Sequence, residues 1–281
     1  MLRPIITAVC CCTALFIVED VLAAKPIQAK QNIDYVPSVD YSDNRDKLDV
    51  YLPKVRDNNP VLVHFHGGGL TFGSKEKGSK AFAETFAQLG LCVVAPNYRL
   101  APEHLFPAQM LDAVKAIKWA VQHMQSYGCD TSNIVISGHS AGAYLAALLA
   151  VDEQWLSKLA NLRGNIQGVV AISPLLELSN LNKTHLEQVW GTDKHIYRSA
   201  SVTSHIEQNK LPMLLMYADN DHPGMDKEIQ QFAQAMFINH NHVQVIEAMN
   251  RDHKSIINQL LKKDDVVKSS VMGWISLLNA N

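Results

Sequence analysis

The feature that most constrains the fold is an alternation of short apolar segments with longer amphipathic ones. Six runs of four or five residues, rich in β-branched and other apolar side chains, predict buried strands. Strands that alternate with helical segments form a parallel sheet with helices on both faces, so we expect the α/β class. The predicted strands are 61–65, 91–95, 134–137, 169–172, 213–217 and 243–246, and the predicted helices are 80–88, 108–127, 144–151 and 227–237.

Two further segments complete the organisation of the chain. Residues 33–36 and 47–52 predict a hairpin with its turn near 41–44, which adds an antiparallel edge to the sheet. Residues 173–211 are too long for a plain connection and predict a small helical insertion. Because no repeat or low-complexity linker interrupts the chain, we expect one domain over residues 30–281.

Composition excludes some classes of partner. Of the 281 residues, 47% are hydrophobic and 19% are charged, as in an ordinary globular protein. The formal net charge of −2 gives no electrostatic attraction to nucleic acid, so no nucleic-acid partner is expected. The twelve histidines lack the Cys/His spacing of a metal site, and no metal is predicted. We expect His64 and His66 to serve packing or hydrogen bonding.

The N-terminus differs from the rest of the chain. Arg3 precedes an apolar run over residues 5–18, and the small residues at 21–24 suit cleavage by signal peptidase. We interpret residues 1–24 as a signal peptide, which predicts a secreted or periplasmic protein. The alternative is an uncleaved membrane anchor, although the run is shorter than the roughly 20 apolar residues of a spanning helix.

Cysteine usage is consistent with a cleaved signal. Three of the five cysteines, at 10–12, lie in the apolar run, so only Cys92 and Cys129 would remain. The predicted sheet places these two on different strands with another strand between them. We therefore expect two free buried thiols, although an oxidising compartment would permit a disulfide.

The pentapeptide G-H-S-A-G at 138–142 stands where the predicted strand 134–137 gives way to a helical pattern. This context is that of a nucleophile elbow, in which Ser140 projects from a tight turn at the start of a helix. Helix N-terminal amides favour the negative charge that develops during acyl transfer. The alternative is a glycine-rich turn without chemistry, and the rest of the site must decide between the two.

A glycine-rich loop supplies a candidate oxyanion hole. H-G-G-G at 66–69 directly follows a predicted strand, roughly 70 residues before Ser140. Successive glycines leave backbone N–H groups unobstructed, so this loop and the amide of Ala141 can bind an oxyanion. A glycine triplet alone also fits a flexible or phosphate-binding loop, but its place after a strand favours the oxyanion hole.

The acid and the base are expected after the serine, in that order. The predicted strand 213–217 leads into Asp219 and Asp221. We favour Asp221, which lies deeper in the loop and near Pro223, and expect Asp219 to be solvated or to cap the loop.

His253 is the candidate base because it alone follows the loop after the last predicted strand. His222 adjoins the acid, whereas His240 and His242 precede that strand. His253 would take the proton of Ser140, and the acid would fix its tautomer.

These segments together resemble the α/β-hydrolase superfamily, and within it the esterases similar to hormone-sensitive lipase and to kynurenine formamidase. The resemblance runs from K-L-D-V-Y-L-P at 47–53 to R-D-H at 251–253, and it includes N-Y-R-L-A-P-E-H at 97–104 and F-P-A at 106–108. It implies an eight-stranded, mostly parallel sheet and supports Asp221 over Asp219. The implied site comprises the triad Ser140, Asp221 and His253, with oxyanion donors at Gly68, Gly69 and Ala141.

The chain departs from these relatives in two places. Lipase-like members often carry a sizeable N-terminal cap, whereas here only a short segment lies between the predicted signal and the first strand. Substrate selection is therefore expected to depend on that segment and on residues 173–211. Formamidases commonly have an aromatic residue soon after the glycine motif, where this chain has Leu70-Thr71-Phe72. Arg99 and Glu103 are expected to order the loop near the site.

We therefore expect a serine hydrolase that cleaves small carboxylic esters through an acyl-enzyme on Ser140, without metal or organic cofactor. Short acyl chains are favoured because no large hydrophobic lid is evident. A formamide or other amide is the alternative substrate, since the same machinery cleaves both. The non-enzymatic alternative is a ligand-binding protein on an inactive hydrolase fold, and the oligomeric state is not predicted.

Overall fold

An eight-stranded sheet organises the computed structural model, which describes residues 26–37, 41–262 and 264–280. The strand order is β1-β2-β4-β3-β5-β6-β7-β8, and β2 is antiparallel to both neighbours while all other pairs are parallel. The predicted fold class and antiparallel edge are confirmed. The strands are β1 (Ile27–Asp34), β2 (Lys47–Pro53), β3 (Asn59–Phe65), β4 (Cys92–Pro96), β5 (Cys129–His139), β6 (Ile166–Ile172), β7 (Met213–Asn220) and β8 (Val243–Asp252).

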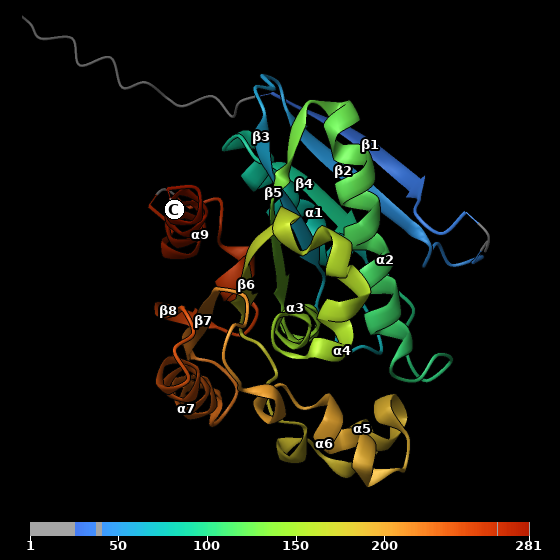
Figure 1. Ribbon diagram of the computed structural model, residues 1–281, viewed down its shortest axis with the longest axis vertical. Coiled ribbons are helices and arrows are strands. Elements are labelled where there is room, and N and C mark those ends of the chain that lie inside the picture. Colours follow the sequence, from blue (N-terminus) through green and yellow to red (C-terminus); the bar gives the residue numbers. More distant parts are fainter. Residues whose placement is uncertain (1–25, 38–40, 263, 281) are drawn as a thin grey trace, which may run out of the picture.

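Helices cover both faces of this sheet (Figure 1). One hydrophobic cluster joins the sheet to α1, α8 and α9, and a larger one joins its other face to α2, α3, α4 and α7. The central strands are apolar along their whole length because both of their faces are buried. The helices are α1 (Lys80–Gln88), α2 (Ala108–His123), α3 (Ala141–Val151), α4 (Glu153–Leu156), α5 (Lys183–Trp190), α6 (Lys194–Ala200), α7 (Met225–Ile238), α8 (Ser255–Asn258) and α9 (Val266–Leu278).

The helix α3 lies at the centre of the larger cluster, and all of its residues are buried. It begins at Ala141, directly after Ser140, three residues earlier than the sequence pattern predicts. Its many alanines let it approach β5 and β6 closely. Ser140 therefore lies in the turn between the central strand β5 and the fully buried helix α3.

Residues 173–211 connect β6 to β7 and contain α5, α6 and two short 3-10 turns. Figure 1 shows these helices in gold at one end of the molecule, below α3 and α4. A side chain caps the N-terminus of each helix: Asn182 accepts a hydrogen bond from the backbone amide of His185, and Asp193 accepts one from that of His195. The segment forms a separate helical layer over one end of the sheet.

The expectation of two free thiols is wrong, since Cys92 and Cys129 form a disulfide with a Cα–Cα distance of 6.2 Å. The strand β3 does lie between β4 and β5. However, both cysteines are the first residues of their strands, and β5 shifts its register against β3 between Pro60 and Val61. This irregular start brings the cysteines together in spite of the intervening strand.

The C-terminal part differs most from the predicted elements. The strand β8 continues to Asp252, six residues beyond its predicted end, because an exposed edge strand lacks a continuous apolar run. The helix α9 was not predicted, although its buried residues recur with helical spacing. The predicted signal peptide lies outside the described residues, and no described helix has the length and apolar character to cross a bilayer.

Candidate active site

Ser140 occupies a crowded turn between β5 and α3. Its φ of 54° lies in a region that side chains other than glycine rarely adopt. A Cβ atom at Gly138 would lie 2.2 Å from the carbonyl carbon of Gly142, and one at Gly142 would lie 2.1 Å from the carbonyl oxygen of Phe65. At both glycines of G-H-S-A-G a side chain would overlap backbone atoms, so only glycine fits there. The turn holds Ser140 in its strained conformation.

The structure brings Ser140, His253 and Asp221 together. The Nε2 atom of His253 lies 2.9 Å from Oγ of Ser140, and its Nδ1 atom lies 2.7 Å from Oδ1 of Asp221. A carboxylate only accepts hydrogen bonds, so Nδ1 carries the hydrogen and Nε2 is free to accept the serine proton. Each of the three residues directly follows, or nearly follows, the end of a strand, in the arrangement of a serine-hydrolase triad.

Hydrogen bonds hold the carboxylate of Asp221 in its charged form. Besides the hydrogen bond from His253, it accepts hydrogen bonds from the hydroxyl of Ser173 at 2.5 Å and from the backbone amides of His222 at 2.8 Å and Ala218 at 3.1 Å. Burial raises the pKa of Asp221, but these hydrogen bonds outweigh burial and place the pKa well below its ordinary value. The carboxylate is thus ready to stabilise a positive charge on the imidazole.

Asp219, the other candidate acid, has a different role. Its exposed side chain accepts the backbone amide of Arg251 at 2.8 Å. This contact joins the end of β7 to the end of β8, two residues before His253. Asp219 therefore caps the loop before His253, whereas Asp221 is the aspartate that contacts the His253 ring.

Ser173 is a site residue that the sequence did not single out. It directly follows β6, has a φ of 50° and points its hydroxyl at Asp221. The signal was its position, since it is a polar residue at the carboxyl end of a predicted strand between two strands that carry catalytic candidates. Parallel strands bring such residues to one edge of the sheet.

Two of the three predicted oxyanion donors border the space in front of Ser140. Gly69 and Ala141 line the same pocket as the serine. Gly68 precedes them in a tight turn, in which its carbonyl accepts the amides of Thr71 and Phe72. Ala141 is the first residue of α3, so its N–H is one of the helix donors without an intrahelical partner.

Two histidines under this loop are buried and neutral. His64 lies 2.9 Å from the hydroxyl of Ser137, and His66 donates from Nδ1 to the carbonyl of Gly67. Burial holds the pKa of His64 well below its ordinary value and lowers that of His66 to about 4. Tyr98 stacks on His66 and donates to its backbone carbonyl at 2.7 Å. These histidines pack and form hydrogen bonds, as predicted.

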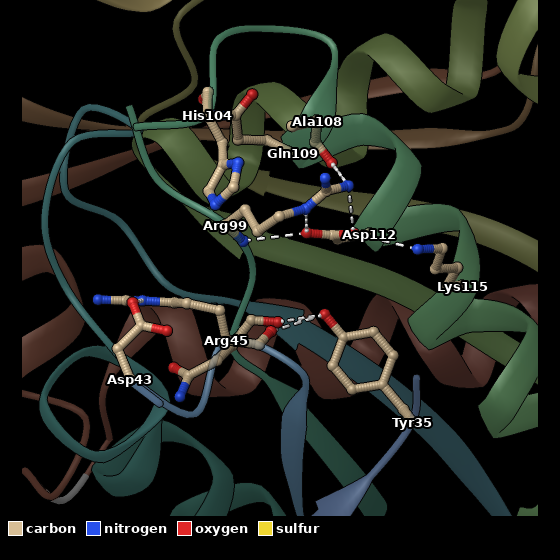
Figure 2. Close-up of polar contacts among 10 residues, drawn as sticks. Tyr35, Asp43, Arg45, Arg99, His104, Ala108, Gln109, Asp112 and Lys115 are labelled. Atoms are coloured by element: carbon tan, nitrogen blue, oxygen red, sulfur yellow. Dashed lines mark hydrogen bonds and ion pairs between the residues drawn. The ribbon is translucent and has the colours of Figure 1, made fainter. Parts of the chain in front are cut away.

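The N-Y-R-L-A-P-E-H motif fixes the loop between β4 and α2. Figure 2 shows the guanidinium of Arg99 paired with both carboxylate oxygens of Asp112, at 2.7 and 2.8 Å. In the same loop, the backbone amide of Phe106 donates a hydrogen bond to the carbonyl of Val189 in α5. Arg99 thus orders the loop that supports the helical insertion, whereas Glu103 is exposed.

A pocket of about 260 Å³ opens in front of Ser140. Its walls come from the loops that carry Ser140 and His253 and from the helical insertion. Trp190 donates from its indole to the hydroxyl of Tyr144, which itself donates to the carbonyl of Ala200. The two aromatic side chains therefore turn their polar atoms into the protein and offer apolar surface to the pocket.

The one carboxylate in the pocket wall outside the triad is also held by the protein. Glu228 accepts the amides of Leu176 and Glu177 at 2.9 and 3.0 Å, and it accepts the side-chain amide of Asn180. These donors satisfy much of its hydrogen-bonding capacity. A small, mostly apolar molecule fits such a pocket best.

Among the described residues, one group of side chains could supply three metal-ligating atoms, namely Asp221, His222 and His253, whose atoms lie within 4.8 Å of one another. Asp221 and His253 already bond to each other, and His253 also faces Ser140. A metal ion here would have to displace these hydrogen bonds. The arrangement of the donors therefore fits acyl transfer by the serine rather than metal binding.

Comparison with known proteins agrees with this geometry. The carboxylesterase NlhH of Mycobacterium tuberculosis is 38% identical over 98 residues, which is 35% of this chain and 31% of that protein, so the match spans about a third of the relative. The kynurenine formamidase of Danio rerio is 27% identical over 239 residues, which is 82% of this chain and 78% of that protein.

Solved structures share the fold over nearly the whole chain. A Pyrobaculum calidifontis esterase has a TM-score of 0.71 at 21% identity, covering 92% of this chain and 86% of its own. Thermogutta terrifontis esterase 2 phosphorylated by paraoxon has a TM-score of 0.67 at 25% identity, covering 88% and 91%. The sequence profile of the BD-FAE family matches residues 48–236. The chain therefore belongs to the BD-FAE family and has the α/β-hydrolase fold of these esterases.

Proposed function

We propose that the protein is a serine hydrolase that cleaves small carboxylic esters through an acyl-enzyme on Ser140. The observation that carries the proposal is the position of His253, 2.9 Å from the serine Oγ and 2.7 Å from Asp221. The relatives named as carboxylesterase and esterases support the same reaction class.

The proposed reaction proceeds in two steps. His253 takes the proton of Ser140 as the Oγ–carbon bond forms, and the negative charge on the carbonyl oxygen is stabilised by backbone amides of Gly68, Gly69 and Ala141. The C–O bond to the leaving group then breaks, and His253 returns the proton to the departing alcohol. Water, deprotonated by the same imidazole, attacks the acyl carbon, the Oγ–carbon bond breaks, and His253 returns the proton to Oγ of Ser140 as the acid leaves.

The pocket supports a compact, neutral substrate. Its volume of about 260 Å³ lies below the usual range of ligand pockets, so a long acyl chain would extend outside it. Its aromatic wall of Tyr144 and Trp190 favours apolar groups. The carboxyl group of Glu228 in the wall disfavours a negatively charged group on the substrate.

A formamide is the second candidate substrate. The kynurenine formamidase of Danio rerio aligns with most of this chain, and amide hydrolysis needs the same triad. The leaving group would then be an aromatic amine, protonated by His253. The two candidates differ in the leaving group and not in the first chemical step.

The decisive experiment combines labelling with a substrate screen. A fluorophosphonate should label the wild type, and Ser140→Ala should abolish labelling while Ser276→Ala, which changes an exposed serine of α9, should not. Hydrolysis of p-nitrophenyl esters from acetate to decanoate should fall with chain length, and N-formylkynurenine tests the formamide. A folded wild type that is neither labelled nor active would support the ligand-binding alternative.

We also propose that the protein is secreted or periplasmic. The disulfide between Cys92 and Cys129 supports an oxidising compartment, because such bonds rarely persist in the cytosol. Mass spectrometry of protein from fractionated cells tests this, since export with cleavage predicts a mature N-terminus near residue 25. An intact N-terminus in the membrane fraction would support the anchor instead.

A further inference from the structure

His139, the second residue of G-H-S-A-G, contacts the loop of the candidate base. Its Nε2 atom lies 2.7 Å from the backbone carbonyl oxygen of His253, a residue 114 positions further along the chain. The ring centroids of the two histidines are 4.9 Å apart. Because His139 directly precedes Ser140, the turn that carries the nucleophile also holds the backbone of the base.

The chemistry of this contact requires one form of His139. A backbone carbonyl can only accept, so Nε2 must carry the hydrogen. On the other side of the ring, a Cβ atom at Gly67 would lie 3.1 Å from Nδ1, so the glycine loop closes against the imidazole. Burial and the neighbouring His253 lower the pKa of His139 to about 4, which keeps the ring neutral near pH 7.

Several parts of the chain hold the loop that carries His253. It follows β8, an edge strand with mostly exposed side chains. Apart from the triad contacts and the short turn capped by Asp252, Arg251 pairs with Asp265 and its amide donates to Asp219. His253 itself is contacted at its ring by His222, with centroids 4.0 Å apart, and at its backbone carbonyl by His139. Asp219 bonds to the backbone two residues before His253, whereas His139 bonds to the backbone of His253 itself.

We propose that His139 is a positioning residue for the reaction, which donates to the carbonyl of His253 and thereby sets the distance between its Nε2 and Oγ of Ser140. The inference rests on the proposed function, because this distance matters only if His253 is the base. A displacement of about 1 Å at a reacting group can cost up to roughly a hundredfold in rate. Loss of the donor should therefore lower kcat and leave substrate binding nearly unchanged.

The test compares two side chains of equal length at position 139. His139→Gln keeps an N–H donor, and His139→Met has the same length without one. We expect His139→Met to lower kcat for p-nitrophenyl acetate by about 10- to 100-fold with KM within about twofold, and His139→Gln to recover most of the loss. The rate of fluorophosphonate labelling should follow the same order.

Folding and the two proposals can be separated. Both variants are assayed at a temperature where circular dichroism shows them folded, and His139→Asn, whose donor is too short to reach the carbonyl, should behave like His139→Met. Equal activity of His139→Met and the wild type, or an equal loss in His139→Gln and His139→Met, would overturn the role of His139. A Ser140→Ala variant that retains the activity of the wild type would instead overturn the proposed function.

Discussion

The proposed catalytic edge of the sheet, which carries Ser140, Ser173, Asp221 and His253, and the helical insertion that follows Ser173 up to residue 211 are built in different ways. At the catalytic edge, residues from four strand ends are joined by hydrogen bonds between distant parts of the chain, such as Ser173 with Asp221 and Asp221 with His253. The insertion is formed by short helices that are capped by their own side chains. Its contacts with the rest of the protein include the hydrogen bond from the amide of Phe106 to the carbonyl of Val189 in α5. The first region can hold chemistry in one geometry, whereas the second can change its pocket-facing residues without disturbing that geometry.

The largest expected effect separates the two aspartates of the catalytic edge. Asp221→Asn should lower kcat by about 10⁴-fold, because an amide favours the wrong tautomer of His253. Asp219→Asn removes only a charge-assisted contact to the amide of Arg251 and should change kcat less than tenfold. Steady-state kinetics on both variants measure the difference, and the reverse order would show that Asp219 is the acid.

A smaller effect is expected at the loop that supports the insertion. Arg99→Gln leaves the buried carboxylate of Asp112 without its main partner, and it should lower the free energy of unfolding by about 3 kcal/mol. Lys80→Gln breaks an exposed pair with Glu84 and should change it by less than about 0.5 kcal/mol. Urea denaturation gives both values, and equal values would contradict the anchoring role of Arg99.

The buried histidines beside the oxyanion loop predict acid sensitivity. The folded-state pKa of His66 is about 4 and that of His64 is also depressed, so between pH 6.5 and 4 the unfolded chain binds protons that the folded chain does not. Stability should fall with decreasing pH by about 1.4 kcal/mol per pH unit for each such histidine. The lowered pKa of Asp221 acts only below its ordinary value of 3.8.

Thermal unfolding between pH 7.5 and 4.5 measures this effect. Tm should be nearly constant above pH 7, where no proton is exchanged at these rings, and should fall steeply below pH 6. A Tm that is independent of pH across this interval would show that the two histidines are not neutral in the fold.

The smallest effect should come from the insertion. Trp190→Ala removes an aromatic wall from the pocket and should shift the preferred p-nitrophenyl ester to a longer chain, with a change in relative kcat/KM of about tenfold. Labelling of Ser140 by fluorophosphonate should remain within a few fold of the wild type. A uniform loss on all esters would mean that the insertion supports catalysis rather than selection.

Much of the catalytic edge could be predicted because the rules that govern it are local. A polar residue at the end of a parallel strand must reach one edge of the sheet, and this placed Ser140, Asp221 and His253 together before any contact was visible. The same rule, applied to β6, would also have found Ser173.

Other features depend on long-range geometry that the residue pattern does not contain. The disulfide depends on a register shift of β5 against β3, which no composition signal marks. The contact of His139 with the carbonyl of His253 depends on how the loop after β8 returns to the elbow. Likewise, nothing in the sequence of α5 shows that Trp190 faces the pocket, because its neighbours include Tyr144 of α3 and Phe106 of the loop before α2.

The central claim is that Ser140 is the nucleophile and forms an acyl-enzyme. Intact-protein mass spectrometry after rapid acid quenching with a p-nitrophenyl ester tests this directly, followed by peptide mapping of the modified residue. We expect a transient mass increase of one acyl group on Ser140 of the wild type and no such increase in Ser140→Ala. Turnover by the wild type with the acyl group on another residue, or unchanged turnover by Ser140→Ala, would contradict it.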